Sequence, residues 1–418
     1  MTTPNTSFTS YQKSVVAILA FLQFTIILDF MILSPLGAIL MPALQISPSQ
    51  FGLAVSVYAF SAGTSGILAA GFTDRFDRKR ILLFFYAGFL FGTFLCAVAP
   101  TYEFLLGARM VTGVFGGVMG SVVLAIITDL FSFEVRGRVM GFIQSAFAGS
   151  QILGLPIGLY LANRFNWHAP FFLIVIIGLM MGLVIMLKLK PVNAHLKLHP
   201  DKSPLHHFLD TVSNPKYLQA FATTALLSLG GFMLMPFGSA FSVHNLGVSL
   251  DKLPLVYMVT GFCAVFTGPL VGRASDSFGK FNTFLFGTIL SIVMVITYTH
   301  LGTTPLPMVI AVNAIMFVGI FSRMIPSQAL MSAIPTPTSR GSFMSISASL
   351  QQMAGGLGSV LAGAIVVEGA DGHIEHFDRV GYVVSGAAVL TLIMMYFIHR
   401  SLPEHAGHLE KTRAKTGA

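Results

Sequence analysis

Three charged side chains, Asp29, Arg109 and Arg323, stand inside long apolar stretches of the sequence. A charge in such surroundings is costly and usually has a function or a partner. A carboxyl group can bind and release protons when burial favours its neutral form and a nearby arginine favours its charged form. Asp29 lies near the centre of its apolar stretch, whereas the remaining carboxylates fall near or beyond the ends of such stretches. We therefore expect Asp29 to carry protons, paired with Arg109 or Arg323; a permanently ionised structural pair is the alternative.

A short segment between Asp74 and Arg80 holds six charges in seven residues. Its carboxylates can accept hydrogen bonds from amides at the start of a neighbouring helix, and its bases can meet carboxylates where a helix ends. Such contacts form only when two helix ends touch, so they can act as a gate between two conformations. The residues predicted to form this gate are Asp74, Arg75, Arg78, Asp129, Asp276 and Lys280. A plain anchor that fixes membrane topology is the alternative.

Part of this charged segment recurs later in the chain. Asp276 matches Asp74 at an offset of 202 residues, and Arg340 matches Arg136 at an offset of 204 residues. Two matches at nearly one offset predict two halves of similar structure. Parallel repeats of this kind, related by an axis along the membrane normal, occur in one large transporter fold.

Other polar and conformationally special residues also interrupt the apolar stretches. Gly154 and Gly158 share one helix face, and Pro156 between them prevents a straight helix, although ordinary bending and packing would need the same residues. The polar side chains expected to line a substrate cavity are Gln23, Gln144, Asn313, Arg323, Gln328 and Gln351. For Arg323 the sequence leaves three functional roles open: binding an anionic group of the substrate, offsetting Asp29, or reaching toward a gate. A structural hydrogen bond between helices is the alternative.

Membrane-spanning helices must position all of these residues. Of the 418 residues 54% are hydrophobic and only 10% are charged, and the mean hydropathy is +0.79. A helical span needs about 20 mostly apolar residues, and the runs lack the period-two alternation of a membrane barrel. We predict an all-α polytopic membrane protein with twelve spans, near 14–42, 51–70, 81–99, 104–130, 137–162, 169–189, 218–243, 253–274, 281–299, 306–333, 342–367 and 380–399.

Charge distribution predicts how these spans are oriented. Nineteen Lys and Arg residues fall on the side of both termini and three on the opposite side, which by the positive-inside rule places both termini in the cytoplasm. The net charge of +8 is therefore a topology signal, and we expect no nucleic-acid partner. A polar segment divides the chain into an N-terminal six-helix bundle (1–189), a cytoplasmic linker loop (190–217) and a C-terminal six-helix bundle with a short cytoplasmic tail (218–418).

The charged segment resembles the signature of the major facilitator superfamily, Gly-x-x-x-Asp-Arg-x-Gly-Arg-Arg. The positions of that signature are occupied here by Ala70, Asp74, Arg75, Arg78 and Lys79. Asp77 replaces its second glycine. Arg109 with Gly113 resembles the helix-4 motif linked to proton transfer in drug antiporters of this superfamily, and the segment from Gly154 to Gly158 resembles the helix-5 pattern of sugar-, nucleoside- and drug-efflux permeases. The resemblance implies twelve helices in two pseudo-symmetric six-helix bundles.

The resemblance and the residues together indicate transport. The sequence has no phosphate-cradling Gly-Lys loop, no metal-ligand spacing and no Ser/His/Asp catalytic pattern, so we expect no enzyme, metal site or cofactor. We predict a secondary active transporter that uses the proton gradient to export a small or drug-like compound by alternating access. An uptake permease or facilitator of the same fold is the alternative, and a non-transporting receptor or scaffold is the third possibility. The expected partners are protons, the substrate and the lipid bilayer of the plasma (inner) membrane, with a multi-pass monomer as the working unit.

Overall fold

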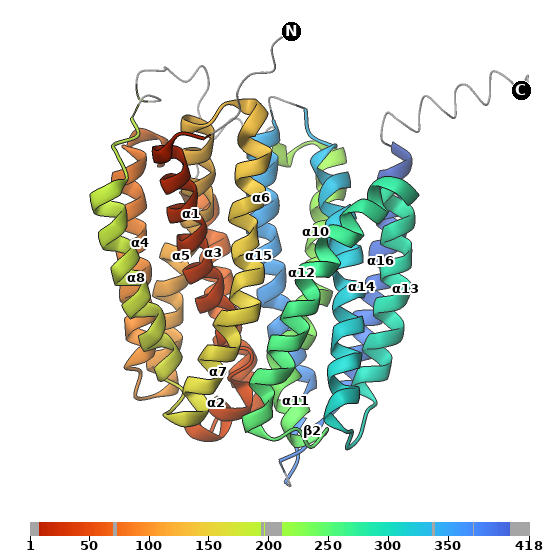
Figure 1. Ribbon diagram of the computed structural model, residues 1–418. Coiled ribbons are helices and arrows are strands. Elements are labelled where there is room, and N and C mark those ends of the chain that lie inside the picture. The colour runs from red at the N-terminus through yellow and green to blue at the C-terminus, as the bar shows by residue number, and fades with distance from the viewer. Residues whose placement is uncertain are drawn as a thin grey trace, which may run out of the picture.

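The computed structural model describes residues 8–69, 73–193, 196, 211–336, 339–370 and 372–401. In this part the chain is a bundle of long helices that run roughly parallel to one another (Figure 1). Helix α1 (Ser10–Ile32) begins and α16 (Phe377–Ser401) ends at the same end of the bundle, called the termini side below; the opposite end is the far side. Most of the predicted linker 190–217, the tail after Ser401, and the side chains of Asp74 and Gln144 lie outside the described part.

The first half of the chain provides the first six predicted spans. Its elements are α1, α2 (Gly37–Leu44), α3 (Pro48–Leu68), the 3-10 turn η1 (Thr73–Arg75), α4 (Arg78–Ala97), α5 (Tyr102–Leu130), α6 (Phe133–Gly149), the π-turn η2 (Ser150–Gly154), α7 (Leu155–Arg164) and α8 (Ala169–Lys188). Side chains start several of these helices. Thr9 and Ser47 form capping boxes at α1 and α3, and Asp77 accepts a hydrogen bond from the backbone N–H of Arg80 at 3.0 Å. A carboxylate at this position satisfies a free amide and suits the positive end of the helix dipole.

The second half repeats this order of elements. It consists of α10 (Pro215–Leu234), η4 (Met235–Phe237), α11 (Gly238–His244), η5 (Leu250–Lys252), α12 (Leu253–Phe278), α13 (Lys280–Thr299), α14 (Leu306–Ser332), α15 (Arg340–Ile365), a two-stranded antiparallel ribbon of β1 (Val367–Glu368) and β2 (Ile374–Glu375), and α16. The first span of each half is broken in the same way, since α1 gives way to α2 just as α10 gives way to α11. Gly279, with φ +92°, makes the turn between α12 and α13, a conformation that favours glycine.

Eleven helical stretches of the described part are long and apolar enough to cross a membrane. The predicted span that is missing from these eleven is the eleventh, 342–367, which corresponds to α15; this helix has 26 residues but a more polar sequence. This helix packs against α3 of the first half and α10 of its own half, so protein rather than lipid surrounds much of it. The predicted fold, an all-α membrane protein with twelve spans in two pseudo-symmetric bundles, is confirmed.

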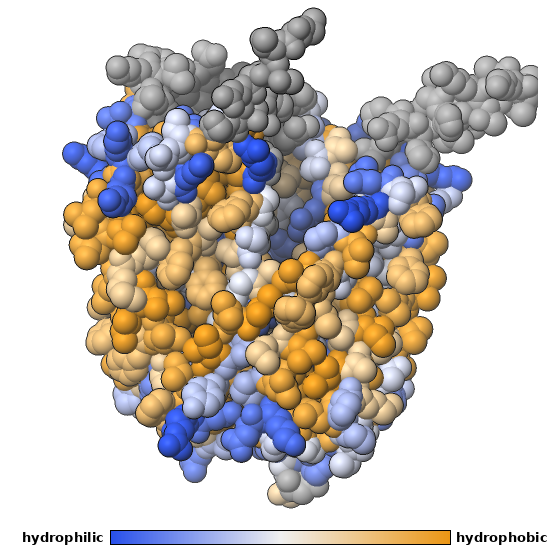
Figure 2. Space-filling view, viewed as in Figure 1, coloured by the Kyte–Doolittle hydropathy of each residue, from blue (hydrophilic) through white to orange (hydrophobic). Residues whose placement is uncertain are grey.

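The two halves share an apolar cluster at the far side and have separate apolar clusters at the termini side, although α3 and α15 stay in contact from Gly363 with Pro48 up to Ser349 with Gly66. One apolar cluster at the far side includes Leu36 and Phe51 from the first half and Phe237 and Phe241 from the second. At the termini side, one cluster contains residues of the first half alone and another contains residues of the second half alone. Figure 2 shows the surface hollowed between the two halves toward the termini side. The structure is therefore closed at the far side and open toward the termini side.

Candidate functional site

Asp29 forms an ion pair with Arg109 in the interior of the first half. Arg109 Nη1 donates to Asp29 Oδ2 at 2.9 Å, and both side chains have 0% exposure. Thr93 Oγ1 lies 3.0 Å from the second carboxylate oxygen, Oδ1, and can donate to it. Three helices, α1, α4 and α5, thus each contribute one side chain, and both oxygens of Asp29 have a hydrogen-bond partner.

Arg109 has fewer partners than a buried guanidinium can use. Besides the carboxylate, its Nη1 lies 3.3 Å from the backbone carbonyl of Asp29, and the guanidinium stands 4.5 Å from the ring centroid of Tyr58 on α3. Its Nε and Nη2 are enclosed and make no hydrogen bond in the described part of the chain. Asp29 is therefore the one anion that holds this cation among the described residues.

Glycines allow α5 to bring Arg109 this close to α3. A Cβ on Gly113 would stand 2.5 Å from the carbonyl oxygen of Tyr58, and a Cβ on Gly117 would overlap the backbone of Ala62. Small residues at such positions allow helix backbones to touch in a membrane. The glycines after Arg109 are thus packing residues. The close approach of α3 and α5 that they allow places Tyr58 beside the arginine.

The Asp29–Arg109 pair does not lie at the middle of the bundle but is displaced from it toward the far side. The sequence suggests one long first span with Asp29 near its centre, but the structure breaks this span after Ile32 and resumes it at Gly37. Arg109 is seven residues from the start of α5, about 10 Å along the helix axis. The far-side apolar cluster, which includes Leu28 and Ile32, separates the pair from the far-side surface.

The helix-5 residues contact α1 beside this site. A Cβ on Gly154 would stand 2.6 Å from Leu28, and one on Gly158 would stand 2.5 Å from Ile32. The π-turn η2 ends at Gly154 and Pro156 lies in the first turn of α7. The two glycines thus allow this span to pack closely against α1 at Leu28, just before Asp29, and at Ile32, just after it. Turns of the π type often occur at functional sites.

Part of the predicted gate also comes together. Arg78 Nε lies 3.1 Å from Asp129 Oδ2, which joins the start of α4 to the end of α5 on the termini side. Arg78 also donates to the Thr73 carbonyl at 3.2 Å. Arg75 and Asp276 are exposed and Lys280 is half-buried; these three make no hydrogen bond or ion pair within the described residues. The observed contact joins two helices of one half.

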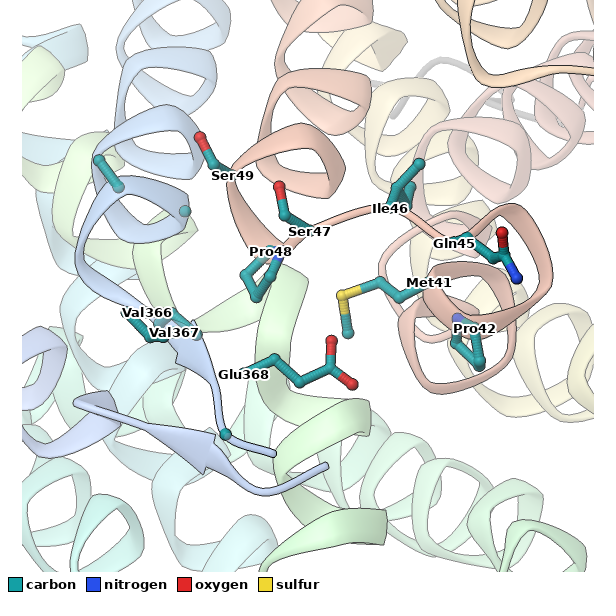
Figure 3. Close-up of a pocket in the computed structure, with 13 residues that line it drawn as sticks. Met41, Pro42, Gln45, Ile46, Ser47, Pro48, Ser49, Val366, Val367 and Glu368 are labelled. Carbon is teal, nitrogen blue, oxygen red and sulfur yellow. The ribbon is translucent and has the colours of Figure 1, made fainter. Parts of the chain in front are cut away.

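A pocket of about 820 Å³ opens on the far side, where the two halves meet. It lies between the turn from α2 to α3 and the segment from α15 to β1, and Figure 3 shows Glu368 extending toward Met41 across it. None of the residues predicted to couple protons or bind substrate lines this pocket. It is a surface feature of the closed end.

Sequence and structure comparisons identify the family. The sequence model of the Major Facilitator Superfamily matches residues 19–359 and, separately, 220–417. The chain belongs to this superfamily. It is 26% identical to the MFS-type transporter YceJ of Bacillus subtilis (strain 168) over 376 residues, covering 89% of this chain and 92% of that protein. It is also 25% identical to multidrug resistance protein 1 of the same organism over 64% of this chain and 69% of that protein.

Solved structures share the fold of this superfamily member. A bacterial homologue of the human lysosomal transporter Spinster, in an inward-facing and occupied conformation, superposes with a TM-score of 0.74 at 15% identity, covering 96% of this chain and 99% of that one. The nucleoside transporter NupG gives a TM-score of 0.72 at 14% identity, with coverage of 92% and 98%. The predicted family is confirmed, and the chain is a multi-pass membrane transporter rather than an enzyme.

The predicted cavity residues of this superfamily member are spread over several helices. Gln23, Asn313 and Gln351 are half-buried, Gln328 is exposed and Arg323 is buried. Asn313 donates to the Val309 carbonyl of its own helix at 2.9 Å. No hydrogen bond links one of these five side chains to another.

Sequence reasoning missed two members of the buried site, Thr93 and Tyr58. A threonine or a tyrosine in an apolar span is common, because its hydroxyl can bond to its own helix, as Thr93 Oγ1 also can with the Phe89 carbonyl at 3.0 Å. Gly113, which contacts the backbone of Tyr58, is the residue in the sequence that could have pointed to Tyr58. It marks where α3 and α5 touch, although sequence alone does not name the residue on the other side.

Proposed function

We propose that this transporter exports a small or drug-like compound in exchange for protons, and that Asp29 carries the proton. The observation that carries the proposal is the enclosed pair of Asp29 and Arg109. Adding a proton to Asp29 removes the negative charge that holds Arg109, so uptake of a proton and release of the arginine are linked. Arg109, with two unused donor nitrogens and an aromatic face beside it, can change partner when the halves move.

The location of the pair supports coupling to a change of conformation. Its immediate neighbours, Leu28 and Ile32, belong to the far-side apolar cluster that joins the two halves. Opening the far side must separate residues of that cluster, and water would then approach Asp29. Alternating access of this kind would let Asp29 take a proton from one side and release it to the other.

Export is the direction supported by two observations. The hollow opens toward the termini side (Figure 2), which the positive-inside rule places in the cytoplasm, so a cytoplasmic compound can enter. The helix-5 glycines and proline match a pattern of efflux permeases, and the relatives include multidrug resistance protein 1. The proposal places the transporter in the plasma membrane as a functional monomer, with both termini in the cytoplasm.

The proposal is tested with everted membrane vesicles from cells that produce the wild type or Asp29→Asn. A panel of toxic compounds first finds a substrate, as one to which overproducing cells are more resistant than deletion cells. Acidifying the vesicle interior should drive accumulation by the wild type, whereas Asp29→Asn should lose this accumulation and keep exchange of labelled for unlabelled substrate.

Glu103→Gln is the matched control, because Glu103 is an exposed carboxylate in the first turn of α5. This variant should accumulate the compound like the wild type. Gradient-driven accumulation by Asp29→Asn at the wild-type level would refute the coupling role. Uptake of the compound into intact cells by this protein would refute the direction.

A further inference from the structure

The second half contains a buried arginine without a partner. Arg323 lies on α14 with 8% exposure, and its Nε is enclosed without a hydrogen bond. Its recorded contact is with an aromatic ring, since the guanidinium carbon stands 5.9 Å from the ring centroid of Phe284 on α13. No described residue forms a hydrogen bond or an ion pair with this side chain. A buried guanidinium is normally paired, so Arg323 is an exception that needs a reason.

None of the described residues provides the missing anion. Asp29 is already bonded by Arg109 and Thr93, so offsetting Asp29 is not the role of Arg323 here. The described carboxylates of the second half lie at or beyond helix ends: Asp251, Asp276, Glu368, Glu375 and Asp378. Arg323 is nine residues before the end of α14, about 14 Å along the axis, and its low exposure shows that the guanidinium does not reach the surface.

The position of Arg323 fits a ligand that enters from the hollow. Phe284 belongs to the apolar cluster of the termini side that contains residues of the second half alone. The hollow in Figure 2 opens toward this same side of the bundle. Arg323 is seventeen residues after the start of α14 and nine before its end, so it lies in the termini-side half of its helix.

We propose that Arg323 binds the anionic group of the transported compound, a carboxylate, sulfonate or phosphate on an organic body. A guanidinium presents a fork of N–H donors that matches such groups, and the Phe284 ring supports the cation from behind. This inference rests on the proposed function only in requiring that a small compound is transported; it does not depend on proton coupling or on direction. It selects the first of the three roles that the sequence leaves open for this residue.

The first arm of the test measures stability without ligand. Purified Arg323→Gln and Arg323→Met should unfold at the same temperature as the wild type or higher, because the arginine has no partner to lose. A clear fall in the unfolding temperature of both variants would assign Arg323 a structural role and overturn the proposal.

The second arm measures binding with matched probes in a detergent without anionic lipid. The acids are naphthalene carboxylate, naphthalene sulfonate and phenyl phosphate, and naphthalene carboxamide and phenol are the neutral counterparts. At least one acid should raise the unfolding temperature of the wild type more than its neutral counterpart does. Its affinity should fall by about tenfold or more in Arg323→Gln, the effect of losing one charge-assisted hydrogen bond, and by less in Arg323→Lys.

Two controls make the result specific. Arg379→Gln removes an exposed arginine at the far side of the same half and should leave acid binding unchanged. Glu103→Gln, which removes an exposed carboxylate of the first half, should also bind the acid like the wild type; because these measurements use no proton gradient, they are separate from the test of coupling. The inference is overturned if no acid stabilises the wild type, or if the neutral counterparts stabilise it equally. It is also overturned if Arg323→Gln binds the acid as well as the wild type. A parallel measurement in vesicles containing phosphatidylglycerol identifies a lipid headgroup as the ligand, and overturns the inference, if stabilisation appears only there.

Discussion

Removing one partner of the buried ion pair should destabilise the protein far more than removing both. Arg109→Met leaves Asp29 with 0% exposure and with Thr93 as its remaining side-chain donor. Breaking an enclosed pair in this way costs about 3–5 kcal/mol, whereas replacing the whole pair by uncharged residues is often close to neutral. The double variant Asp29→Asn with Arg109→Met keeps a polar group beside Thr93 and leaves no charge, so it should lose about 1–2 kcal/mol at most.

The assay is the free energy of unfolding in mixed micelles, measured by titration with a denaturing detergent and followed by circular dichroism. The four proteins of the cycle (wild type, two single variants and the double variant) give the coupling energy between the two positions. Arg80→Met, which removes an exposed arginine at the start of α4, is the control and should change stability little. The reasoning is refuted if Arg109→Met costs less than about 1 kcal/mol, a value typical of exposed pairs, or if the double variant loses the sum of the two single losses.

Three further predictions test other parts of the structure. Gly117→Ala should destabilise the protein by about 1–3 kcal/mol through overpacking against α3, while Gly120→Ala, with nothing within 4 Å of the added carbon, should be neutral in the same thermal unfolding assay. Arg78→Gln, which removes the 3.1 Å contact to α5, should cost about 1 kcal/mol of stability and slow transport several-fold. Unchanged transport rates would show that the charged segment serves only to fix the membrane topology. Cysteines replacing Ser34 and Ser239, where the Ser239 hydroxyl donates across the halves at 3.2 Å, should abolish transport when cross-linked and restore it on reduction; full transport by the cross-linked protein would contradict opening at the far side.

The spans, their order and the repeat were predictable because they depend on composition and local pattern. A run of about 20 apolar residues has few structures available in a bilayer, and the matches of Asp74 with Asp276 and Arg136 with Arg340 follow from sequence alone. The break between Ile32 and Gly37 was not predictable. Ser34, Pro35 and Gly37 are residues that interrupt a helix, but sequence alone does not say whether the span bends there or breaks into α1 and α2, because this depends on the packing of α2 against α11.

The buried site was predictable in its charged members and not in its neutral ones. Asp29 is conspicuous because a carboxylate deep in an apolar run is rare, but the sequence left Arg109 and Arg323 as equal candidates for its partner. The choice depends on which helix touches α1, and in the structure α5 does so and brings Arg109 to Asp29. That no described residue pairs with Arg323 became visible only in the structure.

The central claim, that Asp29 takes up and releases protons, is tested most directly by infrared difference spectroscopy of the purified protein between acidic and alkaline buffer. The wild type and Glu103→Gln should both show the carbonyl band of a carboxylic acid in an apolar environment, and Asp29→Asn should lack that band. Spectra of the wild type and Asp29→Asn that are identical in this region would contradict the account, because Asp29 would then remain ionised as a structural partner of Arg109.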